Sequence, residues 1–231
     1  MSTGDDVSTA DDMNTSSPSP AVRYDAIILA GGRASRLGGV QKAEVEVGGH
    51  ALLDTALEAA ARSNRIVVVG PEELRRERGR DTSARYVGED PPFGGPVAGI
   101  AAGLSALGDF ASAPVWLLVL ACDLPFAPRA VGLLEHALIE IDAEIDAEAD
   151  GEADGVCLVD ADGREQWLAG IYHRTSLRHR VDGLAGGVHG ASVRKLVDGL
   201  DLRHVFDDGA AFDVDTWQDV EEARRSAKEL P

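Results

Sequence analysis

Short apolar runs that stop at a glycine, a proline or an acid are the feature that most restricts the fold of this chain. Alanine- and leucine-rich stretches with helical spacing lie between these runs. Strands that alternate with helices of this length predict βαβ units and a mostly parallel sheet. The expected strands are 24–29, 65–69, 84–87, 115–120, 156–159, 168–172 and 202–206, and the expected helices are 51–63, 72–78, 97–107, 128–140, 175–181, 191–197 and 216–228.

The chain has 231 residues, of which 44% are hydrophobic, and is long enough to bury a core. We expect a single three-layer α/β/α domain over residues 23–231. Its longest apolar run, Val115 to Cys122, is far shorter than the roughly 20 residues that a membrane span needs, and no secretory signal is expected. The two cysteines exclude a disulfide framework. A cytoplasmic protein is therefore expected.

The net charge of −18 is unevenly distributed. Residues 1–22 carry four acids and no base, and residues 140–154 carry eight acids and no base; the remainder has 28 acids and 22 bases. The first segment is Ser-, Thr- and Pro-rich, which predicts a disordered tail. We interpret 141–154 as a solvated acidic insertion, because acids alternating with apolar or small residues fit neither a helix face nor a buried strand. This acidity disfavours nucleic acid and anionic membranes as partners.

A glycine- and cation-rich loop follows the first expected strand. It contains Gly31 and Gly32, and then Arg33, Arg36 and Lys42. Glycines let the backbone N–H groups approach an anion, and the cations add charge, so the loop predicts a phosphate cradle. It matches neither the Walker pattern nor GxGxxG. The alternative is a tight turn with surface cations.

Carboxylates follow the most apolar strand and precede the last helix. Asp123 follows the strand that ends at Leu120, and Asp213 and Asp215 lie two residues apart in an extended segment. Side chains two residues apart in extended backbone point the same way, so either acid could complete a Mg²⁺ site with Asp123. The alternative for all three is a turn or helix-capping role. We expect Cys122 to pack in the core, because no paired histidine motif is evident.

The loop 88–95 is rich in glycine and proline and leads into a helix that contains Gly99 and Gly103. Such glycines would let a flat ring approach the backbone, or let the helix pack closely on the sheet. Ligands of parallel sheets bind beyond the carboxyl ends of the strands, which is where these loops are expected.

In combination, these segments resemble the molybdenum cofactor guanylyltransferases, which belong to the nucleotidyltransferases of glycosyltransferase-A-like, Rossmann-like fold. The similarity spans roughly 24–226. The segments that carry it are Leu29-Ala30-Gly31-Gly32 with Arg36, Leu37-Gly38-Gly39 and Lys42, then Gly95-Pro96-x-Ala98-Gly99, Cys122-Asp123-x-Pro125, Gln166–Tyr172 and Asp213-x-Asp215-Thr216.

The resemblance implies transfer of GMP from GTP to the phosphate of molybdopterin, with release of pyrophosphate and formation of a guanine dinucleotide cofactor. Other cofactor-biosynthesis proteins or the apo-molybdoenzyme would then be partners. It further implies catalysis by Lys42, Arg36 and Asp123, and a metal, Mg²⁺ or else Mn²⁺, held by Asp123 with Asp215 or Asp213. The implied nucleotide contacts are Leu29, Ala30, Gly31, Gly32, Lys42, Asp90, Gly95, Gly99 and Asp123.

The chain departs from the family pattern at several positions. Gln41 stands where the family usually has Asp, Gly70 where it has a nucleotide-contacting Asn, and Asp213 and Asp215 where it often has Asn. The loop 186–190 is the candidate for facing the pterin. Two alternatives remain: a transferase that uses CTP or another nucleotide, or another acceptor such as a sugar phosphate or phospholactate, and a nucleotide-binding regulatory protein without turnover.

Overall fold

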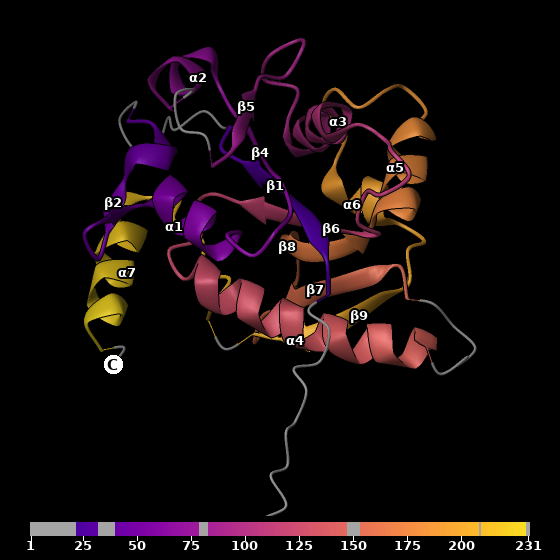
Figure 1. Ribbon diagram of the computed structural model, residues 1–231. Helices are drawn as coiled ribbons and strands as arrows, with labels where there is room; N and C mark the ends of the chain where they lie inside the picture. The colour runs from indigo at the N-terminus through magenta and orange to yellow at the C-terminus, as the bar shows by residue number, and fades with distance from the viewer. Residues whose placement is uncertain (1–21, 32–39, 79–82, 147–152, 208, 230–231) are drawn as a thin grey trace, which may run out of the picture.

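The computed structural model describes residues 22–31, 40–78, 83–146, 153–207 and 209–229. The expected tail over 1–22 and the cations Arg33 and Arg36 therefore lie outside the described residues, apart from Val22. Seven strands form one sheet in the order β5-β4-β1-β6-β8-β7-β9, with helices on both faces (Figure 1). This is the three-layer, mostly parallel α/β arrangement that the alternating pattern predicts.

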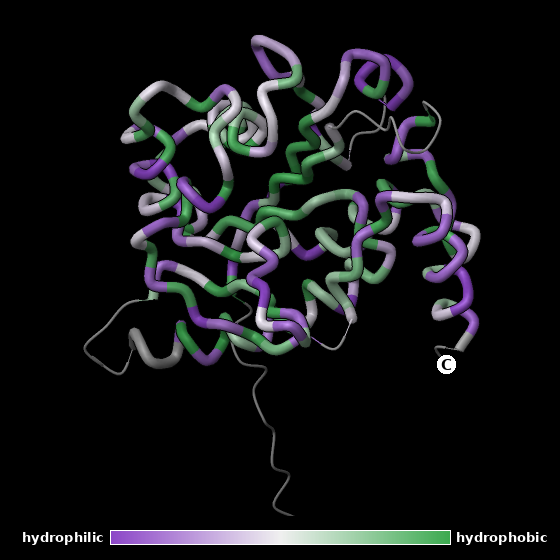
Figure 2. The backbone as a smooth tube through the Cα atoms, turned by 180° about the vertical axis from the view of Figure 1, so that it is seen from behind, coloured by the Kyte–Doolittle hydropathy of each residue, from purple (hydrophilic) through white to green (hydrophobic). Residues whose placement is uncertain are grey.

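One half of the sheet is wholly parallel. Its strands are β5 (Arg85–Val87), β4 (Ile66–Val69), β1 (Tyr24–Leu29) and β6 (Trp116–Ala121). The two central ones, β1 and β6, are buried along nearly their whole length because helices cover both faces, which explains their continuous apolar sequence. Figure 2 shows these hydrophobic residues along the centre of the molecule, whereas the C-terminal helix is largely hydrophilic.

The other half contains the strand that runs against the rest. β8 (Glu165–His173) is antiparallel to both β6 and β7 (Gly155–Val159), and β9 (Leu202–Phe206) is parallel to β7. The pairing of β7 with β8 shifts register between Cys157 and Leu158, so β8 bulges there.

The helices bury two separate apolar clusters against the sheet. α1 (Leu52–Ala59) and α4 (Ala127–Asp146) cover one face, and α3 (Pro96–Leu107), α5 (Arg174–Asp182) and α6 (Val193–Val197) cover the other. A third, small cluster joins α7 (Trp217–Glu229) to the hairpin β2 (Glu46–Val47) and β3 (His50–Ala51). The remaining elements are α2 (Glu72–Arg78) and the 3-10 turn η2 (Lys42–Glu44). Among the described helices, none has both the length and the apolar character of a membrane span.

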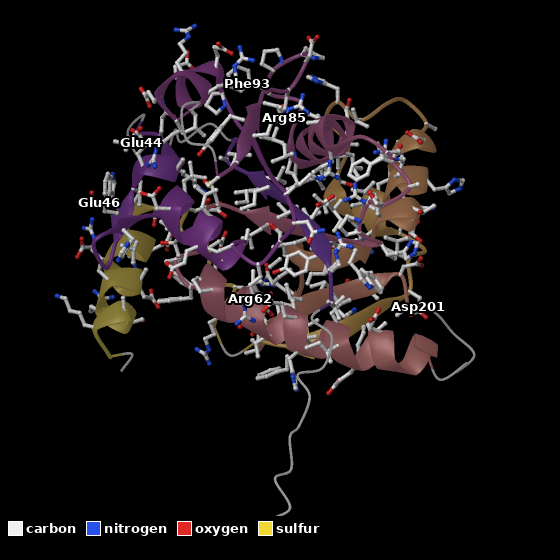
Figure 3. The ribbon with its side chains drawn as sticks, viewed as in Figure 1. Glu44, Glu46, Arg62, Arg85, Phe93 and Asp201 are labelled. Carbon is white, nitrogen blue, oxygen red and sulfur yellow. The ribbon has the colours of Figure 1, made fainter. Side chains whose placement is uncertain are left out.

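A buried ion cluster holds the amino-terminal edge of the sheet. The carboxylate of Asp25 on β1 is fully buried and accepts bonds from Arg174 and, at 2.6 Å, from Arg65. Arg174 also donates its Nε–H to the Pro114 carbonyl at 2.9 Å. Because Arg65 precedes β4 and Arg174 follows β8, this cluster links the two halves of the sheet. The Arg62–Glu135 pair, by contrast, joins the turn after α1 to α4, and its Arg62 side chain, labelled in Figure 3, is exposed.

Each predicted strand and helix has a counterpart, although the helix expected over 51–63 ends at Ala59; one correction and one omission remain. A solvated insertion over 141–154 is wrong for residues 141–146, which continue helix α4. Ile141 is buried one turn beyond Leu138, and the Asp142 carboxylate accepts from the Trp116 indole at 3.4 Å. The apolar spacing of the preceding turns therefore continues where the alternating acids suggested a break. The hairpin β2–β3 and η2 have no counterpart among the expected elements.

Candidate active site

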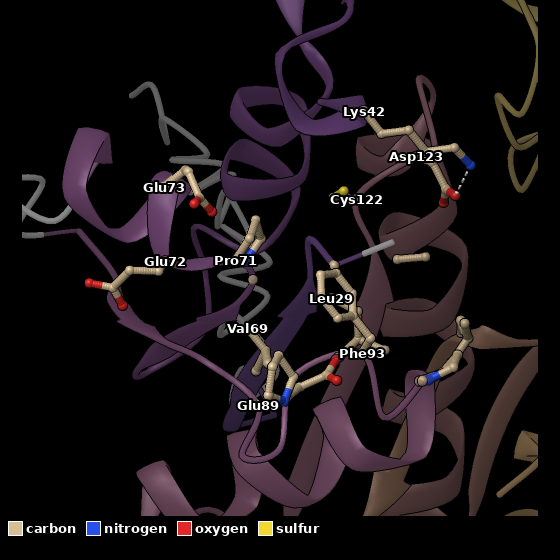
Figure 4. Close-up of a pocket in the computed structure, with 17 residues that line it drawn as sticks. Leu29, Lys42, Val69, Pro71, Glu72, Glu73, Glu89, Phe93, Cys122 and Asp123 are labelled. Carbon is tan, nitrogen blue, oxygen red and sulfur yellow. Dashed lines mark hydrogen bonds and ion pairs between the residues drawn. The ribbon is translucent and has the colours of Figure 1, made fainter. Parts of the chain in front are cut away.

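A cavity of about 780 Å³ opens at the carboxyl ends of the parallel strands. In the view of Figure 4, Lys42 and Asp123 lie toward one end, Glu89 lies toward the other, and Leu29 lies between them. Most of the lining residues end or follow a parallel strand or lie at the start of a helix, whereas Leu168 lies within β8. The lining residues are Leu29, Gly31, Lys42, Val69, Gly70, Pro71, Glu72, Glu73, Glu89, Pro92, Phe93, Gly95, Pro96, Ala121, Cys122, Asp123 and Leu168.

Lys42 joins two carboxylates that are far apart in the sequence. Its ammonium donates to Asp123 Oδ2 at 3.0 Å across 81 positions, and to Asp215 Oδ1 across 173 positions. Burial lowers the pKa of Lys42, but the two carboxylates outweigh burial and raise the pKa above its ordinary value. The ammonium is therefore charged at neutral pH.

The segment before α7 carries Asp215 to this cluster. The N–H of Val214 donates to the Asp123 carbonyl at 3.0 Å, and the Val214 side chain is fully buried. Thr216 and Asp219 then cap the helix reciprocally, since each side chain accepts a bond from the other's N–H. Thr216 thus supplies the capping hydroxyl, and the Asp215 carboxylate accepts from Lys42.

Asp213 adds a third carboxylate to the same region. Burial first, and then the charges of Asp123 and Asp215, raise the pKa of Asp213. Carboxylate oxygens are the ligands that Mg²⁺ and Mn²⁺ take in proteins. The chemistry of Asp123, Asp215 and Asp213 therefore suits a hard divalent cation, but their oxygens do not all lie within 4.8 Å of one another, and the Lys42 ammonium bonds both Asp123 and Asp215. Among the described residues, the cavity lining contains four acids and one base, and Asp123 is the member of this carboxylate group that belongs to it.

Glu89 forms the opposite end of the cavity. Its Oε2 accepts from the Gly94 N–H at 2.6 Å. A Cβ placed on Gly31 or on Gly99 would lie 3.5 Å from the other oxygen, Oε1. A Cβ on Gly99 would also come within 2.9 Å of the Leu29 side chain. Oε1 thus lies in van der Waals reach of both glycines, and the close packing of Leu29 is what favours glycine at position 99.

The expected nucleotide contacts that the structure describes fall into three groups. Leu29, Gly31, Lys42, Gly95 and Asp123 line the cavity; Ala30 and Gly99 are buried beside it; Asp90 is exposed and absent from the lining. Gly32 and Arg36 lie outside the described residues. Gly95 has a φ of 87°, a conformation that favours glycine, and Pro96 follows at the first position of α3.

Some lining residues were not anticipated from the sequence. The expected contacts in the loop 88–95 were Asp90 and Gly95, and neither Glu89 nor Phe93 was among them. Glu89 could have been found by the criterion used for Asp123, since it is also an acid that follows a strand. Phe93 is 63% exposed and lies on the outer rim of the molecule in Figure 3. The loop 186–190, expected to face the pterin, packs on the loop 88–95, since the Gly190 N–H donates to the Gly94 carbonyl at 2.7 Å.

Cys122 lines the cavity but is buried. Burial, and then the neighbouring Asp123, raise the pKa of its thiol well above the usual range. A thiol that stays protonated is a poor nucleophile. The side chain therefore packs in the core, as the sequence suggested.

The sheet order and the cavity at the carboxyl ends of the parallel strands define a three-layer α/β protein with a ligand site of the kind that such sheets carry. A family model described as the MobA-like NTP transferase domain matches residues 26–205. The chain belongs to this family.

Three similar proteins add detail. The molybdenum cofactor guanylyltransferase of Rhodopseudomonas palustris (strain HaA2) is 35% identical over 128 residues, which are 52% of this chain and 56% of that protein. The chain thus spans about half the length of the curated relatives it matches. Molybdopterin-guanine dinucleotide biosynthesis protein A from Archaeoglobus fulgidus superposes with a TM-score of 0.65 at 18% identity, over 90% of this chain and 100% of that one. Rv0371c of Mycobacterium tuberculosis H37Rv, in a complex with manganese, superposes with a TM-score of 0.59 at 18% identity, over 89% and 100%.

Proposed function

We propose that this protein transfers GMP from GTP to the phosphate of molybdopterin and releases pyrophosphate. Membership of the MobA-like NTP transferase family and the guanylyltransferase relatives support this reaction. The observation that carries it is the Lys42–Asp123–Asp215 cluster at the end of a cavity large enough for a nucleotide.

In this reaction an oxygen of the acceptor phosphate attacks the α-phosphorus of GTP, and the bond to the pyrophosphate oxygen breaks. Both reactants are anions, so the protein's main work is to position them and to stabilise charge. Lys42 would exchange one of its carboxylate partners for a phosphate oxygen as the nucleotide enters. Arg36, which belongs to the same loop, is proposed to assist it.

Asp123 and Asp215, with Asp213 beside them, are the residues that would hold a divalent cation, Mg²⁺ or Mn²⁺. When bound, the cation would offset the repulsion between the triphosphate and the incoming phosphate. Asp123 is the central ligand in this proposal, because its backbone also receives the bond from Val214 that fixes the segment of the other two acids.

Glu89 is proposed to select the base. Guanine presents two adjacent donors, N1–H and the 2-amino group, and a carboxylate can accept from both. Adenine and uracil lack that pair on the matching edge, and cytosine offers its amino group beside an acceptor. With Oε2 bonded to Gly94, the position of Oε1 between Gly31 and Gly99 supports this role.

The proposed setting follows from the substrates. Molybdopterin would be delivered by, and its dinucleotide passed to, other cofactor-biosynthesis proteins or the apo-molybdoenzyme. Both cysteines are free and buried, which suits the cytoplasm, where we place the reaction.

Melting temperatures with Mg²⁺ and each of GTP, CTP, ATP and UTP test the nucleotide. A nucleotide at about 100 times its dissociation constant should raise the melting temperature by roughly 5–11 °C, and we expect this for GTP alone. A shift with CTP instead would contradict the proposed base.

Turnover of GTP with molybdopterin, followed by release of pyrophosphate, tests the chemistry. Lys42→Ala should lower turnover by about 10²–10³-fold, whereas Lys228→Ala on the exposed surface of α7 should leave it unchanged. Equal activity of the two variants would exclude the role proposed for Lys42.

A further inference from the structure

Three side chains that the proposed reaction does not use converge at the other end of the sheet. Cys157 lies on β7, Glu165 on β8 and His204 on β9. One ligand atom from each, a thiol sulfur, a carboxylate oxygen and an imidazole nitrogen, lie within 4.8 Å of one another. We call these residues the β7–β9 cluster. Sulfur, imidazole and carboxylate together are the ligand types of zinc sites.

The register of the sheet builds this cluster. Cys157 pairs with His204 across the parallel strands β7 and β9, so both side chains point to the same face. On the other side, the bulge places Glu165 opposite Val159, which shares the face of Cys157. Uninterrupted pairing from Cys157–Gly170 would have placed residue 168 there. The bulge therefore turns Glu165 onto the face that carries the thiol and the imidazole.

The cluster is open to solvent on one side. The side chains of Glu165 and His204 are 34% and 53% exposed, and the Cys157 side chain beneath them is buried. His204 Nε2 and Glu165 Oε1 are 2.7 Å apart. An ion can thus enter between the carboxylate and the imidazole and reach the sulfur, with a fourth position left for water.

We propose that the β7–β9 cluster is a binding site for a borderline-soft divalent cation of the Zn²⁺ class, separate from the carboxylates around Asp123. The two sites lie on different strands. Asp123 follows β6, from which β7 is separated by β8, so about 10 Å of sheet lies between them. The thiol and the imidazole distinguish this ligand set from one for Mg²⁺ or Ca²⁺, which prefer oxygen alone.

Binding of the metal ion to this cluster releases a proton. The Cys157 thiol releases its proton to solvent, His204 binds through a neutral ring nitrogen, and the metal bonds replace the contact between His204 and Glu165. Burial, and then the charge of Glu165, raise the pKa of Cys157 to about 12. The ion therefore competes with the thiol proton.

An ion at this site would fix the bulge of β8. The bulged segment contains Leu168, which lines the nucleotide cavity, and Trp167, whose carbonyl accepts from the Tyr172 hydroxyl at 2.6 Å. Tying Glu165 to β7 and β9 holds the start of this segment. Zinc would thus stabilise the far wall of the cavity from a distance, without contacting nucleotide.

Metal-free protein titrated with Co²⁺ and Zn²⁺ in excess Mg²⁺ tests the site, because Mg²⁺ occupies the oxygen-only ligands. We expect a thiolate-to-cobalt charge-transfer band in the native protein that disappears in Cys157→Ser and in His204→Gln. Zn²⁺ at about 100 times its dissociation constant should raise the melting temperature by about 5–10 °C in the native protein and by under about 1 °C in His204→Gln. Because His204 is more than half exposed, that variant should fold.

His136→Gln is the matched control. His136 also lies near a carboxylate, Glu140, at 3.8 Å, but has no thiol in that pair. This variant should keep both the cobalt band and the zinc shift. The proposal is overturned if the native protein gives no thiolate band, or if His204→Gln keeps it. None of these measurements depends on GTP transfer, so the zinc site and the proposed reaction can fail separately.

Discussion

The two halves of the sheet place their polar groups in different ways. In the parallel half, β5-β4-β1-β6, the lining residues lie mainly in loops that follow the strands, and the strands supply mainly core. In the other half, β8-β7-β9, the β7–β9 cluster lies on the strands themselves, and register and a bulge bring it together. In the parallel half the site can thus be recognised from loop sequences, whereas in the mixed half the cluster depends on the register of strand pairing, which the sequence does not display.

The halves meet at Asp25, and breaking that junction should have the largest effect. Asp25→Asn leaves the buried Arg174 without its ionic partner, which should cost about 3–5 kcal/mol of unfolding free energy and lower the melting temperature by about 6–20 °C.

Arg62→Ala serves as the comparison for that variant. It breaks a surface ion pair in which Arg62 is 81% exposed, so the loss should stay below about 1 kcal/mol. If both variants melt alike, the buried cluster is not what joins the halves.

The next effect is confined to activity. Asp123→Asn keeps the shape of the side chain but removes the charge that faces Lys42, and should lower turnover by about 10²–10³-fold while the melting temperature stays near that of the native protein. Asp162→Asn, in the exposed turn between β7 and β8, should be fully active. A fully active Asp123→Asn variant would show that the carboxylate at the end of β6 has no role in catalysis.

A smaller effect concerns base choice. Glu89→Gln can still accept from the Gly94 N–H but lacks a second acceptor oxygen, so the preference for GTP over ATP should fall by about 10–100-fold. The measurement is kcat/KM for each nucleotide. Asp90→Asn, at the neighbouring exposed acid, is the control. The assignment would be reversed if Asp90→Asn changed the preference and Glu89→Gln did not.

The smallest effect is a dependence of stability on pH. Because the pKa of Asp213 is raised in the folded protein, the folded state holds that proton more tightly than the unfolded state. Stability therefore falls as pH rises from the ordinary aspartate pKa of about 3.9 through the raised value. Asp213→Asn should be more stable than the native protein at pH 7 by about 0.5 kcal/mol, given solvent screening, and equal to it below about pH 3. Thermal melts at both pH values without added metal measure this, and a less stable variant at pH 7 would contradict it.

How far the sequence predicts the structure also differs between the halves. β1, β4 and β6 could be placed from apolar runs and their glycine, proline or acidic ends, and the loop residues Leu29, Gly31, Lys42 and Asp123 followed from them. The sequence could not show which of the neighbouring acids Glu89 and Asp90 faces the cavity, because adjacent loop residues differ only in the direction of their side chains. The helical residues 141–146 were missed because alternating acids hid the burial of Ile141.

The β7–β9 cluster had no sequence signal at all. Cys157, Glu165 and His204 show no metal-binding spacing, and an unbroken strand would have placed residue 168, not Glu165, on the shared face. Bulges depend on packing between strands, which local sequence patterns do not report.

The 173 positions between Lys42 and Asp215 have a consequence for protein synthesis. A ribosome adds about 5–20 residues per second, so Lys42 emerges about 9–35 s before its second carboxylate. During that interval the parallel half can fold, but its ammonium has only Asp123 as a partner once that residue appears. The charge cluster can close only after Asp215 has been made, so the nascent chain completes this cluster well after the parallel strands.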